Sequence, residues 1–74
     1  MQTQRGETIT VNGALRSLPT DGTVSTLLTQ MDISLHKLGV AVAVNGEIVR
    51  RAEWIERRLK HGDYVEIVRP TQGG

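Results

Sequence analysis

The 74-residue sequence predicts an α+β fold in which a mixed β-sheet carries one main helix on a single face. Two Asn-Gly pairs, at 12–13 and 45–46, stand between segments of alternating apolar residues, and such pairs are the strongest short-range signal for a β-hairpin. One amphipathic stripe between them predicts the helix. The apolar residues are mostly Val, Leu and Ile, with no Phe, which favours an aliphatic core against a sheet.

The first hairpin is expected over residues 7–18. Residues 7–11 alternate apolar and threonine side chains, as a half-buried strand does. Asn and Gly tolerate the positive φ of a type I′ turn, so the chain is expected to return as a second strand over residues 14–18. Pro19 ends that strand because proline has no N–H to donate to a neighbouring strand.

The main helix is expected to follow a turn at residues 20–22. Thr23 is a suitable N-cap, since its hydroxyl can accept a hydrogen bond from a free backbone N–H of the first turn. Residues spaced i, i+3, i+4 and i+7 form one apolar stripe, namely Val24, Leu27, Leu28 and Met31. This stripe predicts packing against the sheet, in preference to docking of a partner helix, because the sheet needs cover.

The second half of the chain is expected to supply three strands. Residues 40–44 alternate valines, which face the helix, with Ala41 and Ala43, which leave the opposite face of the sheet flat. The second Asn-Gly pair leads into a short strand over residues 47–50. The last strand is expected over residues 64–69, with Val65 and Ile67 on the face opposite to Tyr64, Glu66 and Val68.

Residues 52–60 are expected to form a short helical turn that closes over the edge of the core. Its apolar residues are Trp54, Ile55 and Leu59. Trp54 is interpreted as a packing residue in preference to an interface anchor.

The order of these elements is that of the β-grasp (ubiquitin-like) fold. We expect a frayed N-terminal extension over residues 1–6, a single β-grasp domain over residues 7–69 and a flexible C-terminal tail over residues 70–74. The topology of this fold places the last strand in the middle of the sheet beside the first. The tail would therefore leave from a rigid platform.

Composition excludes several classes of function. Nine basic and eight acidic residues give a formal net charge of +1, which is too balanced to indicate a nucleic-acid partner. No apolar run approaches the ~20 residues that span a membrane, and cysteine is absent, so we expect a cytoplasmic protein without membrane contact. No phosphate-binding loop, Ser/Cys–His arrangement or paired-carboxylate motif predicts an enzyme. A metal site would need His36, His61 and scattered acids, and none is expected.

A run of basic residues leaves two interpretations open. It comprises Arg50, Arg51, Arg57, Arg58, Lys60 and His61. One interpretation is a solvated basic face that Glu53 and Glu56 interrupt. The other is a docking patch for an acidic protein partner.

The C-terminal sequence predicts a functional terminus. Pro70 cannot extend a sheet ladder, and the residues after it, Thr71, Gln72, Gly73 and Gly74, have no bulky apolar side chain to hold them down. The two glycines leave no side chain beside the terminal carboxylate, so a narrow channel in another protein can admit the backbone. The alternative is a loose end without a function.

These residues resemble the ubiquitin-like sulfur carriers, in particular the ThiS family of thiamine biosynthesis. The matching motifs are Ile-Thr-Val-Asn-Gly at 9–13, Thr-Val-x-x-Leu-Leu at 23–28, Val-Ala-Val-Asn-Gly-Glu-Ile-Val-Arg-Arg-x-x-Trp at 42–54, Leu-x-x-Gly-Asp-x-Val at 59–65 and Gly-Gly at 73–74. The resemblance covers nearly all of the chain from residue 7 on.

The resemblance implies a carrier that other enzymes load and unload. A ThiF-type adenylyltransferase would use ATP to join the carboxylate of Gly74 to AMP. Sulfur from a persulfide, derived from cysteine by a cysteine desulfurase or another donor, would then convert the terminus into a thiocarboxylate. The thiocarboxylate would donate its sulfur to the thiazole precursor in a ThiG-type thiazole synthase. The carrier itself would bind no cofactor and catalyse no step.

The expected site therefore has two parts. Gly73 and Gly74 form the reacting end, and Gln72, Thr71 and Pro70 are expected to contact the partner's channel. The flat outer face of the sheet is expected to dock partners through Ala41, Ala43, Tyr64, Glu66 and Val68. Two alternatives stay open: the small subunit of molybdopterin synthase, a related sulfur carrier, and a β-grasp modifier or adaptor that carries no sulfur.

Overall fold

The computed structural model describes residues 6–70, and the predictions made for residues 1–5 and 71–74 lie outside this range. Within it, the chain forms five strands and one α-helix. They are β1 (Thr8–Val11), β2 (Ala14–Ser17), α1 (Val24–Gln30), β3 (Ala41–Val44), β4 (Glu47–Val49) and β5 (Tyr64–Val68), with a 3₁₀ turn, η1 (Arg51–Glu53), after β4.

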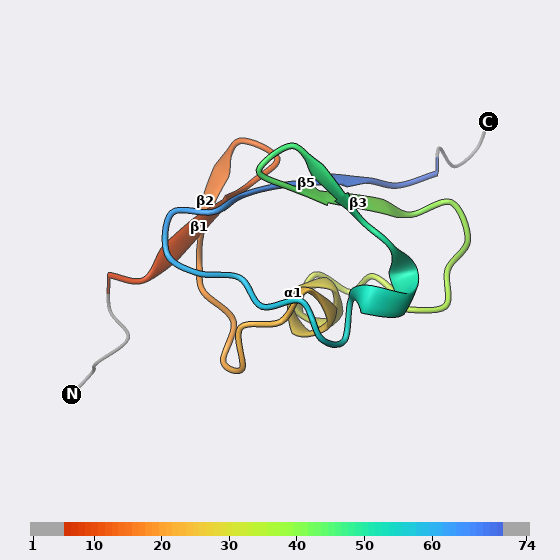
Figure 1. The fold of residues 1–74 in the computed structure, drawn as a ribbon, viewed down its shortest axis with the longest axis horizontal. Coiled ribbons are helices and arrows are strands. Elements are labelled where there is room, and N and C mark those ends of the chain that lie inside the picture. Colours follow the sequence, from red (N-terminus) through yellow and green to blue (C-terminus); the bar gives the residue numbers. More distant parts are fainter. Residues whose placement is uncertain (1–5, 71–74) are drawn as a thin grey trace.

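The strands form one mixed sheet in the order β2-β1-β5-β3-β4. The central strand, β5, runs parallel to β1 and antiparallel to β3, and each hairpin is antiparallel. Helix α1 covers one face of this sheet and leaves the other face open (Figure 1). The predicted β-grasp fold is confirmed, including the position of the last strand beside the first.

The core lies between the inner face of the sheet and α1. Side chains at alternate positions of the strands point toward the helix, as the alternation in the sequence predicts. The buried residues are Ile9, Val11, Val24, Leu27, Leu28, Ile33, Val40, Val42, Val44, Val49, Trp54, Leu59, Val65 and Ile67. The apolar stripe of the helix is thus a packing surface, and Trp54 is a packing residue, as predicted.

Helix α1 begins at the predicted N-cap. The Thr23 hydroxyl oxygen accepts a hydrogen bond from the Thr26 N–H at 3.1 Å. The Asp21 carboxylate in turn accepts bonds from the Thr23 N–H and hydroxyl, each at 3.0 Å. The bond from the Thr23 N–H, supported by threonine hydroxyls, lowers the pKa of Asp21 below its usual value. The charged carboxylate therefore keeps the cap residue in place.

The first Asn-Gly turn is also bonded to the central strand. Asn12 has the expected positive φ of 50°. Its side-chain Nδ2 donates to the Ile67 carbonyl at 3.0 Å, and its Oδ1 accepts from the Ile67 N–H at 2.8 Å. The amide thus pairs with β5 as one more residue of β1 would, and it extends the two-residue register of that parallel pair.

The second Asn-Gly turn holds the other end of the central strand. The Asn45 N–H donates to the Tyr64 carbonyl at 2.7 Å, and its side-chain oxygen accepts from the Tyr64 N–H at 2.9 Å. Its Nδ2 donates to the buried carboxylate of Asp63 at 3.0 Å. Burial raises the pKa of Asp63, but the bonds from Asn45 and from the Lys60 N–H outweigh it, so the net shift is downward.

Some sequence-based boundaries were wrong. Residues 7, 18, 40, 50 and 69 lie just outside the strands in which they were expected. Ile55 was expected to close over the core, but its side chain is 71% exposed. The reason is the tight turn that starts at η1, which directs Trp54 and Leu59 inward and the side chain between them outward.

We expect Asn12→Ala to lower the free energy of unfolding by about 2–3 kcal/mol. The substitution removes two hydrogen bonds to β5 and places a Cβ-bearing residue without a polar side chain at positive φ. Asn12→Gly is the matched control because it removes the same bonds and keeps the turn conformation. Urea unfolding of both variants separates the contribution of the two hydrogen bonds from that of the strain at positive φ. Equal stability of wild type and Asn12→Gly would contradict a role for the amide.

Candidate functional site

The predicted docking residues lie together on the open face of the sheet. Their positions follow from the register, in which Ala41 pairs with Val68 and Ala43 with Glu66. Val68 is 62% exposed and Tyr64 is 43% exposed. Ala41 and Glu66 are also exposed, whereas Ala43 is half-buried. The structure therefore brings all five of these residues onto the face opposite α1.

The sequence-based prediction did not include two large apolar side chains that lie on this face. Leu15 on β2 is 73% exposed, and Ile48 on β4 is 71% exposed. The register places Leu15 across from Thr10 and Ile48 across from Ala43. The Ile48 position was available from the sequence, because a two-residue Asn-Gly turn fixes which residues of the hairpin face each other. We call the set Leu15, Ala41, Ala43, Ile48, Tyr64, Glu66 and Val68 the outer face.

The C-terminal segment leaves the body of the protein at the end of β5. Arg69 and Pro70 follow the strand, and the Pro70 ring packs against Gly39. A Cβ atom built on Gly39 would lie 3.2 Å from Pro70 Cβ, and the φ of Gly39 is +86°. Both facts require glycine at this position. The predictions for Thr71, Gln72, Gly73 and Gly74 fall outside the described residues.

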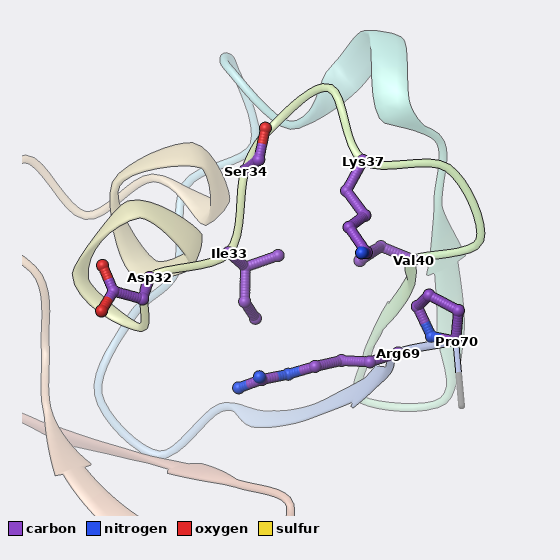
Figure 2. A pocket seen from close by; sticks show the side chains of 7 residues that line it. All are labelled: Asp32, Ile33, Ser34, Lys37, Val40, Arg69 and Pro70. Carbon is purple, nitrogen blue, oxygen red and sulfur yellow. The ribbon is translucent and has the colours of Figure 1, made fainter. Parts of the chain in front are cut away.

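A pocket opens beside this exit. It has a volume of about 260 Å³ and is lined by Asp32, Ile33, Ser34, Lys37, Val40, Arg69 and Pro70. Figure 2 shows the Lys37 and Arg69 side chains on two sides of the space, with Ile33 on a third. The segment after α1 forms one wall and the end of β5 forms the other. We call this the tail-base pocket.

Arg51 holds the wall of this pocket that follows α1. Its guanidinium donates to the Leu35 carbonyl and, at 2.5 Å, to the Lys37 carbonyl. The same group lies over the Trp54 ring, 4.6 Å from its centroid. The Trp54 indole is itself fixed, because its Nε1 donates to the Val49 carbonyl at 3.0 Å. The Arg-x-x-Trp part of the sequence motif thus connects the core to the tail-base pocket.

The basic run is partly explained by such structural contacts. Besides Arg51, Arg58 donates to the Asp21 carbonyl at 3.1 Å, and the Nδ1 of His61 accepts from the Thr8 N–H at 3.0 Å. Three of its six members therefore fix backbone groups of other segments. These contacts favour the interpretation as a solvated face whose members also hold the chain together.

Within residues 6–70, no group of three or more His, Asp or Glu side chains is placed to hold a metal ion. In the same range, no helix has both the length and the apolar character that crossing a membrane requires.

A mixed five-stranded sheet with one helix, an apolar outer face and a C-terminal segment that leaves the central strand defines a ubiquitin-like β-grasp protein. Comparison with known families then identifies the family within this fold. The ThiS family model matches residues 9–74, and the chain belongs to the ThiS family. The family expected from the sequence motifs is therefore confirmed.

One solved structure supports the same assignment. The thiamine biosynthesis protein (ThiS) from Geobacter metallireducens is 29% identical to this chain, with a TM-score of 0.70. The similarity covers 90% of this chain and 99% of that protein. No curated protein matches the chain.

We expect Arg51→Ala to lower the free energy of unfolding by about 1–2 kcal/mol, through the loss of two hydrogen bonds and the contact with Trp54. Hydrogen exchange at the amides of His36 and Lys37 should accelerate more than exchange in β5. Arg51→Lys is the matched control, since it keeps the charge but loses the planar fork that reaches both carbonyls. Unchanged exchange at these two amides in Arg51→Ala would show that the guanidinium does not hold this segment.

Proposed function

We propose that this protein is a sulfur carrier of thiazole and thiamine biosynthesis. The observation that carries the proposal is the match to the ThiS family, which extends from β1 to Gly74 and so includes the terminal glycine pair. The arrangement of β5 supports it, because the strand that leads to the terminus is bonded on both sides within the sheet. The sheet thereby fixes the direction in which the chain leaves the end of β5.

The proposed chemistry takes place at the carboxylate of Gly74. A free α-carboxylate, with a reference pKa of about 3.3–3.7, is ionised at neutral pH and is a poor electrophile. Attack of this carboxylate on the α-phosphorus of ATP in a partner adenylyltransferase gives an acyl adenylate and releases pyrophosphate. A persulfide then displaces AMP, and reduction of the resulting S–S bond by a thiol leaves the thiocarboxylate. The chain supplies the reacting end, and its partners supply the catalysis.

The outer face is proposed as the surface that docks these partners. It is the side of the sheet that α1 leaves open, and four large apolar residues are exposed on it. Large apolar side chains exposed on one face are a feature of protein–protein contact sites. It borders the end of β5, so a partner that covers it can also receive the tail. A ThiF-type adenylyltransferase and a ThiG-type thiazole synthase are the proposed partners.

The family match is to ThiS and gives no support to the molybdopterin alternative. The alternative of an adaptor that carries no sulfur makes a different prediction for the terminus, so one experiment separates it from the carrier.

We expect the full chain, purified from cells that also make its candidate adenylyltransferase and a cysteine desulfurase, to gain the mass of one oxygen replaced by sulfur. The shift should lie on the C-terminal peptide. Deletion of Gly74 should abolish it and leave the melting temperature unchanged, because the core residues of the described range, 6–70, all lie between residues 9 and 67. An unmodified wild-type chain, under conditions that modify a known carrier, would favour the adaptor.

We expect Ile48→Asp to raise the KM of the adenylyltransferase for the carrier by about tenfold, as the loss of one apolar interface contact worth more than about 1 kcal/mol does. Ile55→Asp is the matched control, because both isoleucines are 71% exposed but Ile55 lies outside the outer face. Adenylation kinetics at varied carrier concentration measure the difference. Equal effects of the two substitutions would exclude the outer face as the docking surface.

A further inference from the structure

The tail-base pocket lies beside the point where the C-terminal segment leaves the domain. Its volume of about 260 Å³ exceeds the ~30 Å³ share of one water molecule several times, so it has room for a side chain. Its floor is apolar, with Ile33 and Val40 both buried. Its walls carry the exposed cations Lys37 and Arg69.

The two cations come from segments that are far apart in the sequence. Lys37 lies in the segment between α1 and β3, and Arg69 follows β5 (Figure 2). The backbone at Lys37 is held by Arg51, and the ring of Pro70, the residue after Arg69, packs against Gly39. The pocket thus presents two positive charges on segments whose positions are fixed by these contacts. Asp32 is the one acidic residue among those that line it.

The position of the pocket determines what can cover it. Pro70 lines the pocket, and four residues separate it from the terminal carboxylate. Fully extended, those four residues reach only about 14 Å, at 3.3–3.6 Å each. A partner whose active site encloses the terminus must therefore bring the mouth of its channel close to Pro70 and over the pocket.

We propose that the tail-base pocket receives an acidic side chain from the channel mouth of the protein that accepts the tail. The apolar floor fits the stem of an Asp or Glu side chain, and Lys37 and Arg69 would bind its carboxylate. Pairing of opposite charges at the edge of an interface fixes the orientation of the two proteins and speeds their encounter. This inference rests on the proposed function and adds to it a second contact, separate from the outer face.

The test uses the candidate ThiF-type adenylyltransferase and the full chain as its substrate. Lys37→Met and Arg69→Met remove each charge but keep an apolar stem of similar length. Each should raise the KM for the carrier by about threefold, the size of a surface ion pair, with kcat unchanged. The double variant should raise KM by less than the product of the two, because both cations bind one carboxylate.

The matched control is Lys60→Met, which removes one charge near the opposite end of β5. It should leave KM unchanged, and an equal rise in this variant would assign the effect to net charge and overturn the proposal. The differences should shrink between about 0.05 M and 0.5 M salt, since screening weakens exposed ion pairs. Circular dichroism of each variant checks that the fold is retained.

Asp32→Asn should change KM in the opposite direction. Asp32 has a φ of +64°, which asparagine also tolerates, so the substitution removes the negative charge without straining the backbone. It should lower KM by about twofold. Unchanged KM in all the pocket variants, with normal adenylation of the wild type, would overturn the pocket proposal alone.

Two further outcomes would have a different meaning from those above. Absence of any adenylation of the wild type would instead overturn the proposed function. If the pocket bound the chain's own terminal carboxylate, Lys37→Met and Arg69→Met would lower KM by releasing the tail, and the acidic partner group would be excluded.

Discussion

The structure depends on how its central strand is held. β5 has a neighbouring strand on each side, parallel β1 and antiparallel β3, and it also leads into the C-terminal segment. The parallel register with β1 is only two residues long, and the Asn12 side chain extends it by bonding both backbone groups of Ile67. Asn45 bonds Tyr64 at the other end in a similar way. Each hairpin turn is therefore also a clamp on β5.

This arrangement explains why such a small domain can present a tail. A chain of this size buries a limited core, so its stability is marginal and each hydrogen bond to the central strand matters. The side chains of Asn12, Asn45 and Asp63 satisfy backbone groups near both ends of β5. The segment after Val68 therefore starts from the best-supported strand of the sheet.

A second network links the core to the region where the tail leaves. Trp54 is buried and bonded to Val49, Arg51 stacks on its ring, and the guanidinium holds the segment that carries Lys37. Gly39, in the same segment, meets the Pro70 ring. One face of the molecule thus presents apolar side chains, and the region beside the tail presents charges. These are the two surfaces that we propose to dock a partner.

The sequence alone determined the fold class, both hairpins, the helix with its Thr23 cap and the inward-facing residues, because these follow from local turn chemistry and from the periods of strand and helix. It also identified the family, and it placed five members of the outer face. Leu15 and Ile48 were missed, although the two-residue Asn-Gly turns fix the register that places both of them on that face.

Only the tertiary structure decided the rest. Side-chain bonds from Asn12 to Ile67 and from Arg51 to Leu35 join residues far apart in the chain, and no local pattern encodes their distance. The same holds for the tail-base pocket, whose two cations line one space because β5 ends beside the segment after α1. The exposure of Ile55 also depends on the tertiary structure, since the turn that starts at η1 directs only some of the apolar residues of 52–60 into the core. Local periodicity specifies elements, whereas contacts between distant residues are set by how those elements pack.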